Sequence, residues 1–339
     1  MAAVSKLHPK DRESPTLSVV VPCYDEEGSL PELFKRVTAV CDQVAPGSYE
    51  IVLVDDGSRD RTRALIRELA AAHESVTGVF LSRNYGHQLA LSAGLRICRG
   101  QRILIIDADL QDPPELLPAM MAKMDAGADV VYGKRALRVG ETPFKNASAY
   151  LFYRTLERLV DIRIPNDTGD FRLMSRRALD ALNSMPEQHR FIRGMVSWIG
   201  FTQVPVEYER SARFSGETKY TLVKMMRFAA DAISGFSIVP LRASTYIGFF
   251  CALIGVFFMG WTIVSYLAGV AVQGWTTLMV VVLILGSAQL IVLGVIGEYL
   301  GRLYMEAKRR PLFIIEEIVR NDQGDMVQPN PQTLLNTAL

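Results

Sequence analysis

The chain has 339 residues, a formal net charge of +1 and 49% hydrophobic residues. Its near-neutral charge, without a basic stripe interleaved with aromatic residues, argues against a nucleic-acid partner. The hydrophobic content is high for a purely soluble protein and is concentrated in residues 243–297, which contain no Asp, Glu, Lys or Arg. The four cysteines lack metal-ligand spacing, which favours free thiols in a reducing compartment. Residues 1–16 are polar, without an apolar signal core, and are expected to form a flexible cytosolic N-terminus.

The first hundred residues alternate between apolar runs rich in β-branched residues and amphipathic segments. The runs predict strands over Leu17–Pro22, Tyr49–Val54, Thr77–Leu81 and from Ile103 onward. The segments between them predict helices over Leu30–Val44, Thr62–His73 and Gln88–Cys98. This alternation predicts an α/β fold with a right-handed, mostly parallel sheet. Ligands bind such sheets beyond the carboxyl ends of the strands, where polar clusters follow each run.

The fourth run ends in the sequence ILIIDADLQDPPE, which places Asp107, Asp109 and Gln111 at a spacing of two. On an extended segment these side chains would project towards one side and share a hard cation and a diphosphate. The motif therefore predicts a Mg²⁺ or Mn²⁺ site beside a nucleotide. The alternative is a capped, solvated strand end.

Further acidic residues follow the first two strands. Asp55 directly succeeds Val54, so its carboxylate can accept hydrogen bonds from a base or a ribose, and Glu26 can do the same. For Asp56 and Ser58 the sequence instead favours shaping a turn and capping a helix.

The middle of the chain predicts a helix over Glu115–Ala126 and a strand over Asp129–Tyr132. Residues 166–173 form a polar, glycine-bearing loop that runs into an apolar run, a second candidate for a site at the sheet edge. The amphipathic segment Phe144–Val160 fits either a membrane surface or a soluble core. Arg210–Tyr220 combines arginines, glycine and hydroxyls, and indicates a mobile anion-binding loop rather than a linker.

The C-terminal third predicts a membrane hairpin. Two spans, Ala243–Leu267 and Thr276–Glu298, are each long enough to cross a hydrocarbon core of about 30 Å. Basic residues lie before the first span and after the second, so the positive-inside rule places both ends in the cytoplasm. Gln289 and Glu298 are costly near lipid and are expected to face another helix or subunit. The expected domains are 17–220 (cytoplasmic catalytic domain), 221–242 (amphipathic interface helix), 243–300 (two transmembrane helices) and 301–339 (cytoplasmic tail).

Several motifs together give the chain a family resemblance over about Leu17–Arg310. They read VVPCYDEEGSL, IVLVDDGSRDRT, SRNYGHQLALSAG, DADLQDPPE, GDFRLMSR, RFSGETKY and GEYLGR. The chain resembles the polyprenyl-phosphate glycosyltransferases of the dolichol-phosphate mannose synthase-like group in glycosyltransferase family 2, in particular bacterial bactoprenol glucosyltransferases. The resemblance implies a GT-A (Rossmann-like) fold. In two departures, Asp25 stands where Asn is usual, and Ala149 stands where a serine is frequent, with Ser148 one place earlier.

The resemblance also implies residue roles. The nucleoside would be held by Pro22, Tyr24, Glu26 and Asp55, and the divalent ion that bridges the diphosphate by Asp107, Asp109 and Gln111. Arg135 and Lys145 would meet the lipid phosphate, Arg213 and Lys219 would close over the donor and acceptor phosphates, and Asp170 would act as a base. A phosphate monoester has its second pKa near ~6, so most of the acceptor is already a dianion at pH 7. Positioning by arginines should therefore matter more than a base.

The implied activity is inverting, metal-assisted transfer of one sugar, glucose by likeness, from a UDP-sugar to polyprenyl (undecaprenyl) phosphate. It would take place at the cytoplasmic face of a bacterial inner membrane and serve modification of cell-envelope glycans such as lipopolysaccharide. The expected partners are the sugar nucleotide, the lipid acceptor, the bilayer and further copies of the chain, with a tetramer favoured. Three alternatives stay open: another sugar (mannose, aminoarabinose or N-acetylhexosamine), a processive polysaccharide synthase, and a non-enzymatic membrane scaffold. The processive enzymes typically carry a Gln-x-x-Arg-Trp motif and more spans, which this sequence lacks.

Overall fold

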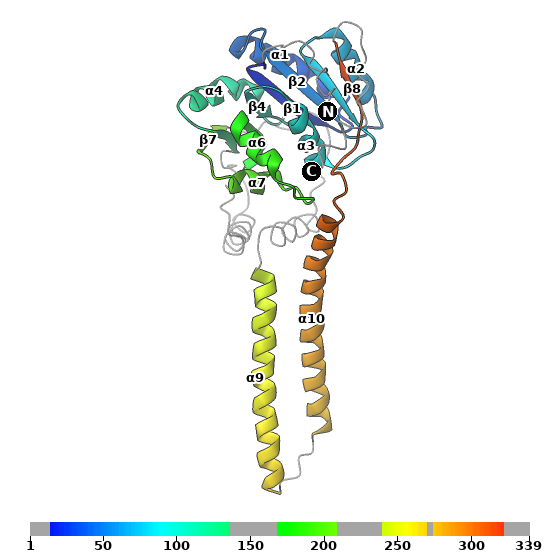
Figure 1. Ribbon diagram of the computed structural model, residues 1–339, viewed down its shortest axis with the longest axis vertical. Helices are drawn as coiled ribbons and strands as arrows, with labels where there is room; N and C mark the ends of the chain where they lie inside the picture. Colours follow the sequence, from blue (N-terminus) through cyan, green and yellow to red (C-terminus); the bar gives the residue numbers. More distant parts are fainter. Residues whose placement is uncertain (1–13, 136–167, 209–238, 270–273, 322–339) are drawn as a thin grey trace, which may run out of the picture. The chain divides into compact units, whose positions relative to one another are not determined.

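The computed structural model describes residues 14–135, 168–208, 239–269 and 274–321. These residues divide into two compact units (Figure 1). One unit contains the sheet and includes a strand near the C-terminus, and the other contains two long helices. The expected segment Phe144–Val160, the loop Arg210–Tyr220 and nearly all of the amphipathic region 221–242 lie outside the described residues.

The first unit contains one eight-stranded sheet with the order β7-β5-β6-β4-β1-β2-β3-β8. Its strands are β1 (Leu17–Cys23), β2 (Tyr49–Asp55), β3 (Val76–Leu81), β4 (Arg102–Ile105), β5 (Val130–Arg135), β6 (Thr168–Ser175), β7 (Gln203–Tyr208) and β8 (Ile315–Arg320). Only β6 and β8 run against the others within this sheet. The predicted α/β fold with a mostly parallel sheet is therefore confirmed.

The helices of this unit fall close to the predicted segments, except for the last two, which were not predicted. They are α1 (Leu30–Val44), α2 (Thr62–Ala72), α3 (His87–Ile97), the 3₁₀ turn η1 (Pro114–Leu116) leading into α4 (Leu117–Asp125), α6 (Arg176–Ser184) and α7 (Ile192–Trp198). Prolines favour the starts of α1 and α4. Pro31 and Pro118 occupy first-turn positions of these helices, where the missing N–H costs no helical hydrogen bond.

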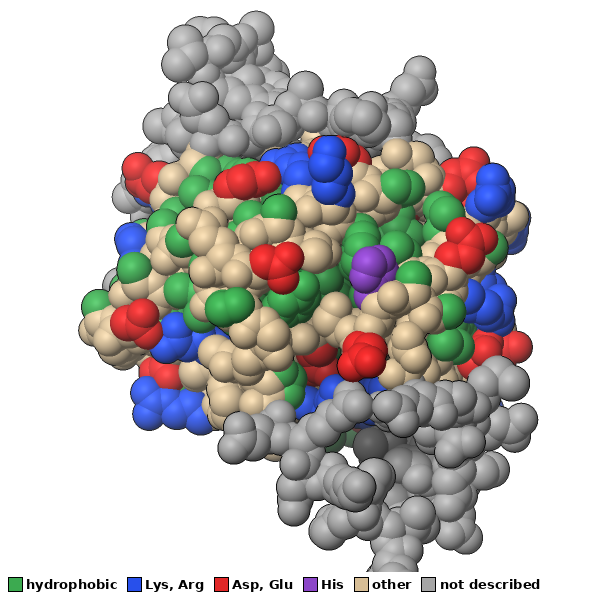
Figure 2. Space-filling model, turned by 90° about the horizontal axis from the view of Figure 1, so that it is seen from above, with side chains coloured by type: hydrophobic (Ala, Val, Ile, Leu, Met, Phe, Trp, Pro, Cys, Tyr) green, Lys and Arg blue, Asp and Glu red, His purple; other side chains and the backbone are tan. Residues whose placement is uncertain are grey.

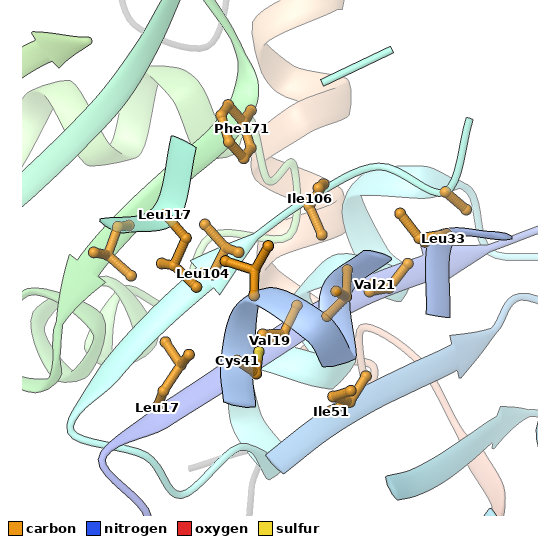
Figure 3. Close-up of a cluster of buried hydrophobic side chains, with 14 of the residues drawn as sticks. Leu17, Val19, Val21, Leu33, Cys41, Ile51, Leu104, Ile106, Leu117 and Phe171 are labelled. Carbon is orange, nitrogen blue, oxygen red and sulfur yellow. The ribbon is translucent and has the colours of Figure 1, made fainter. Parts of the chain in front are cut away.

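The core of the sheet unit is formed by both faces of the central strands. Every residue of β1 is buried, as expected for a parallel strand covered on both sides. Figure 3 shows Leu33 and Cys41 of α1 beside Val19 and Val21 of β1, with Phe171 of β6 in the same cluster. Each such side chain contributes about 1.5–3 kcal/mol when fully buried, so this cluster holds the strand ends in place.

One sheet edge is closed by β8, which pairs antiparallel with β3. Arg63 and Arg67 of α2 bind Glu316 and Glu317 at 2.5 and 2.6 Å, and both guanidinium groups lie over the ring of Phe80. Residues 301–339 were expected to form a cytoplasmic tail, and this strand was not predicted. β8 gives the β3 backbone a partner at what would otherwise be an open edge.

The second unit is a hairpin of α9 (Val239–Leu267) and α10 (Trp275–Ala307), which pack against each other. Within these helices, Val239–Ser265 and Ile284–Ala307 have mean hydropathies of 2.2 and 1.6 and are long and apolar enough to cross a membrane. Glu298 accepts a hydrogen bond from Arg302 at 3.1 Å on the same helix, which offsets part of the cost of a carboxylate there. The exposed side chains of this hairpin unit are largely apolar. On the face of the sheet unit seen in Figure 2, by contrast, acidic and basic side chains are interspersed.

Candidate active site

The loops that follow β1 and β2 are fastened to each other by reciprocal hydrogen bonds. The Asp25 N–H donates to Ser58 Oγ at 3.1 Å, and the Arg59 N–H donates to Asp25 Oδ1 at 2.7 Å. In the same way, the Arg61 N–H donates to Glu27 Oε2 at 3.0 Å. Asp25 has φ 54°, a left-handed conformation that Asp and Asn tolerate better than other non-glycine residues. An Asn carbonyl could accept the same bond, so the departure at Asp25 leaves this connection intact.

Asp55 offers an unsatisfied acceptor at the end of β2. Its side chain is buried, and Oδ1 accepts the Ser58 N–H at 3.1 Å. Its Oδ2 is buried and, within the described residues, has no hydrogen-bond partner. A buried carboxylate oxygen without a donor is costly, so this atom is suited to an N–H or O–H group of a ligand.

The other residues expected at the nucleoside lie next to Asp55. Pro22 pairs with Val54 across β1 and β2, and Tyr24 follows β1 with 40% of its side chain exposed. Glu26 is half-buried and accepts a hydrogen bond from Ser29 Oγ. The structure therefore brings Pro22, Tyr24, Glu26 and Asp55 to the carboxyl ends of two adjacent strands.

A third loop is fixed to this pair by Asp56, whose carboxylate accepts the N–H groups of Tyr85 and Gly86 at 2.7 and 2.9 Å. Asp56 therefore holds the start of α3, whereas it was expected to shape a local turn or cap a helix. Gly57 has φ +70°, and a Cβ at this position would lie 2.7 Å from the backbone nitrogen of Asn84 in the third loop.

The segment after β4 differs from the prediction. Asp107, Asp109 and Gln111 were expected on an extended segment, but residues 108–109 form a turn and Leu110 has φ 59°. The cause is local, because Asp109 Oδ1 accepts the Gln111 N–H at 3.2 Å, a side-chain bond that mimics a backbone turn. Gln111 is buried, whereas the Asp107 side chain is 28% exposed.

Asp107 is electrostatically suited to a cation. Its Oδ1 is buried and has no hydrogen-bond partner within the described chain. Burial, together with the carboxylates of Asp170, Asp112 and Asp109, raises the pKa of Asp107 to about 6 against the opposing effect of His87. Two carboxylates and an amide fit Mg²⁺ or Mn²⁺, which take a few protein oxygens and complete their shell with phosphate oxygens and water. No group of three or more His, Cys, Asp or Glu suited to a metal occurs in the part of the chain that the structure describes.

His87 joins this carboxylate cluster and was not predicted as a site residue. Its Nε2 lies 3.2 Å from Asp170 Oδ2 and 3.4 Å from Asp107 Oδ1. Burial disfavours the imidazolium, but the hydrogen bond to Asp170 and the charges of Asp107 and Asp170 outweigh it and raise the pKa of His87 to about 9. A His-Gln pair at the start of the helix that follows β3 was the available signal in the sequence.

Comparison with known proteins decides the family. A model described as "Glycosyl transferase family 2" matches residues 18–182, and one described as "GtrB C-terminal hairpin" matches residues 239–303. An uncharacterized glycosyltransferase, YkcC, of Bacillus subtilis (strain 168) is 45% identical over 303 residues, 88% of this chain and 93% of the relative. The chain belongs to glycosyl transferase family 2.

Further relatives match over nearly their whole length. The SfII prophage-derived bactoprenol glucosyl transferase of Shigella flexneri is 39% identical over 307 residues, 90% of this chain and 99% of the relative. A prophage bactoprenol glucosyl transferase homolog of Escherichia coli (strain K12) is 39% identical over 303 residues, 89% of this chain and 99% of the relative. The solved structure of S. aureus TarS 1–349 with UDP-GlcNAc covers 65% of this chain and 67% of that chain at 18% identity and a TM-score of 0.45. The family assignment rests on the sequence matches.

In this family 2 chain, Asp170 occupies a different environment from the sheet-edge loop that was predicted. It lies within β6, between β4 and β5, and is 2% exposed. Both carboxylate oxygens accept hydrogen bonds, Oδ1 from Arg193 Nε at 2.8 Å and Oδ2 from Gln88 Nε2 at 3.0 Å. Burial is outweighed by Arg193, His87 and Arg172, which hold the pKa of Asp170 well below its usual range. Such a carboxylate is a weak proton acceptor.

The remaining predicted residues are not placed by the structure. Arg135 ends β5, but its side chain lies outside the described part, as do Lys145, Arg213 and Lys219 altogether. The structure therefore describes the residues expected at the nucleoside and the metal, but not those expected at the acceptor phosphate.

Proposed function

We propose that this protein transfers a single glucose from UDP-glucose to polyprenyl phosphate, with inversion at the anomeric carbon. Its family 2 domain and its match to bactoprenol glucosyl transferases over most of their length support this activity. The observation that carries it is the relative position of two groups of acidic residues. Asp55, with its unsatisfied Oδ2, ends β2, and β1 alone separates β2 from β4, the strand that leads to Asp107 and Asp109. That arrangement suits a nucleoside at one end and a metal-bound diphosphate at the other.

Donor binding begins at Asp55. Its Oδ2 would accept an N–H of the base or a hydroxyl of the ribose, while the exposed ring of Tyr24 offers a surface for stacking. Because the loops after β1 and β2 are fastened to each other, these groups are in position before the ligand arrives.

Asp107, Asp109 and Gln111 would hold a divalent ion. When bound, Mg²⁺ or Mn²⁺ neutralises the negative charge that builds on the leaving diphosphate. The turn closed by Asp109 fixes the spacing of these three residues.

The acceptor needs positioning more than deprotonation. Its phosphate, with a second pKa near ~6, is mostly a dianion at pH 7 and is itself the nucleophile. We therefore assign Asp170 no role as a base, and expect Arg135, Lys145, Arg213 and Lys219 to orient the phosphates.

The hairpin of α9 and α10 would anchor the enzyme in the bacterial inner membrane, where its lipid acceptor resides. Basic residues at both ends of the pair favour a cytoplasmic catalytic domain. Association of several copies, a tetramer by preference, would give Gln289 and Glu298 protein neighbours.

The test is a transfer assay with purified protein in detergent, undecaprenyl phosphate, Mg²⁺ or Mn²⁺ and a panel of nucleotide sugars. We expect UDP release and a lipid heavier by one hexose with UDP-glucose alone. A lipid product from another donor would replace glucose, and a polymer would favour a processive synthase. If no donor gives product and UDP with Mn²⁺ does not raise the melting temperature, the scaffold alternative holds, because a ligand that binds the native state must stabilise it.

A further inference from the structure

Asp170 lies between two guanidinium groups that differ in exposure. Arg172 Nη2 is 3.8 Å from Oδ1, and its side chain is only 4% exposed. Arg193 approaches through Nε at 2.8 Å from Oδ1 and Nη2 at 3.3 Å from Oδ2, with 31% of its side chain exposed. Of these two guanidinium groups, Arg193 is the one that solvent can reach.

The Arg193 guanidinium is held close to the metal-binding residues. Asp170 Oδ2 is 3.2 Å from His87 Nε2, which is 3.4 Å from Asp107 Oδ1. Arg193 is therefore joined to Asp107 through two side chains. Its backbone is fixed as well, since the Ile192 N–H at the start of α7 donates to Gln88 Oε1 at 3.0 Å.

We propose that Arg193 binds the phosphate of the lipid acceptor and that Asp170 and Gln88 are the positioning residues that aim it. This inference rests on the proposed function. A guanidinium matches the geometry of a phosphate and can donate two parallel hydrogen bonds to it. The donor diphosphate would occupy the metal at Asp107, and a second phosphate brought up for reaction would meet Arg193, the solvent-accessible guanidinium of this cluster.

A purely structural ion pair is the competing explanation, and the chain contains a matched control. Arg177 also makes a two-point contact with a buried aspartate, Asp129, through Nε and Nη2. That pair links the start of α6 to the start of β5, at the opposite end of β6 from Asp170. Loss of an arginine that only supports the fold should therefore have the same effect at both places.

The experiment compares Arg193→Gln, Arg193→Lys and Arg177→Gln in the full chain in detergent. KM and kcat are measured separately for undecaprenyl phosphate and UDP-glucose, with the melting-temperature rise given by UDP and Mn²⁺ as a second readout. We expect Arg193→Gln to raise KM for the lipid phosphate about 10- to 100-fold, the loss of one charged hydrogen-bonding contact. KM for the donor and the UDP-induced shift should stay within about twofold. Arg193→Lys should restore part of the affinity, and Arg177→Gln should leave both KM values unchanged.

Equal effects of Arg193→Gln and Arg177→Gln, or an equal rise in both KM values for Arg193→Gln, would overturn the inference. If Arg193→Gln does not fold, Arg193→Lys provides the test, because lysine keeps the charge but loses the two-point geometry. An unchanged KM of this variant for the lipid phosphate would refute the proposal. Failure of the wild-type chain to glycosylate any lipid phosphate, with UDP still bound, would refute the proposed function and this inference with it.

Discussion

The backbone nitrogen of Asn84 lies so close to Gly57 that a Cβ on Gly57 would be only 2.7 Å away. This contact seats the loop after β2 directly against the loop after β3. The loop after β2 follows Asp55 directly, so the position of Asp55 depends on a glycine that contacts no ligand in the proposed mechanism.

Gly57→Ala should destabilise the protein and weaken UDP binding. The φ of +70° costs any alanine about 1–2 kcal/mol, and the collision with backbone atoms of Arg83 and Asn84 adds to it. Gly47→Ala is the matched control, since Gly47 has φ +68° and open space around it. The measurement is the melting temperature with and without UDP and Mn²⁺. Equal losses for the two variants would show that the close approach is unimportant.

Asp109→Asn should preserve the fold and remove metal-dependent turnover. The Asn carbonyl can still accept the Gln111 N–H, so the turn survives while the negative charge is lost. We expect a fall in kcat of about 10²-fold or more, the usual loss when one charge-stabilising group is removed. Asp125→Asn, on the exposed side of α4, is the control. Near-normal activity of Asp109→Asn across a Mn²⁺ titration would contradict the assigned metal site.

Asp170→Asn should leave measurable transfer but reduce stability. General bases usually contribute about 10²–10⁴-fold, so a loss below about 10²-fold would agree with an acceptor that is already ionised. The neutral amide would pair poorly with Arg172, Arg193 and His87, which lowers the melting temperature. Asp129→Asn controls for the loss of a buried, arginine-bound carboxylate elsewhere. A drop near 10⁴-fold with normal acceptor KM would restore Asp170 as a base.

Asp129 should contribute to stability against acid. Hydrogen bonds from Arg177 lower its pKa against the opposing effect of burial, and Ser175 helps. A lowered pKa means that the contribution is complete above the ordinary value near 3.8 and is lost as pH falls through the folded value. Melting curves should show Asp129→Asn about 2–4 °C below wild type at pH 6, the shift given by about 1 kcal/mol, with the gap closing below about pH 4. A gap that keeps its full size however far the pH falls below 4 would contradict this.

The three cysteines of the sheet unit should be unreactive in the native state. Burial raises the pKa of Cys41 and Cys98 to about 12, and that of Cys23 lies well above its ordinary value for the same reason. Because the thiolate is the reactive form, a Cys251→Ser chain should show no rapid thiol labelling at pH 8 and three thiols in denaturant. Rapid labelling of the folded chain would show that the core opens.

The elements that were predicted correctly from the sequence are those that local residue patterns determine. β-Branched runs and helical periodicity located β1 to β4 and their helices to within a few residues, and with them the strand-end acids Asp55 and Asp107. The turn at Leu110 was missed because a side-chain bond from Asp109 overrides the extended conformation that the strand suggests.

Contacts between distant residues could not be predicted in this way. His87 and Asp170 are 83 residues apart, and nothing near either one indicates the other. The same holds for β8, whose Arg320 donates to Thr77, 243 residues earlier. Its sequence, IEEIVR, has adjacent glutamates that interrupt the alternation expected of a strand, and the arginines that compensate them are on α2.

The place of β8 in the chain has a consequence for biosynthesis. The strand that completes the catalytic sheet is translated after both long helices, so a ribosome releases it only when the whole hairpin has been made. Until then the backbone of β3 has no partner on that side. The sheet is therefore finished last, and an interrupted chain that lacks its final residues would carry an open strand edge prone to pair with other chains.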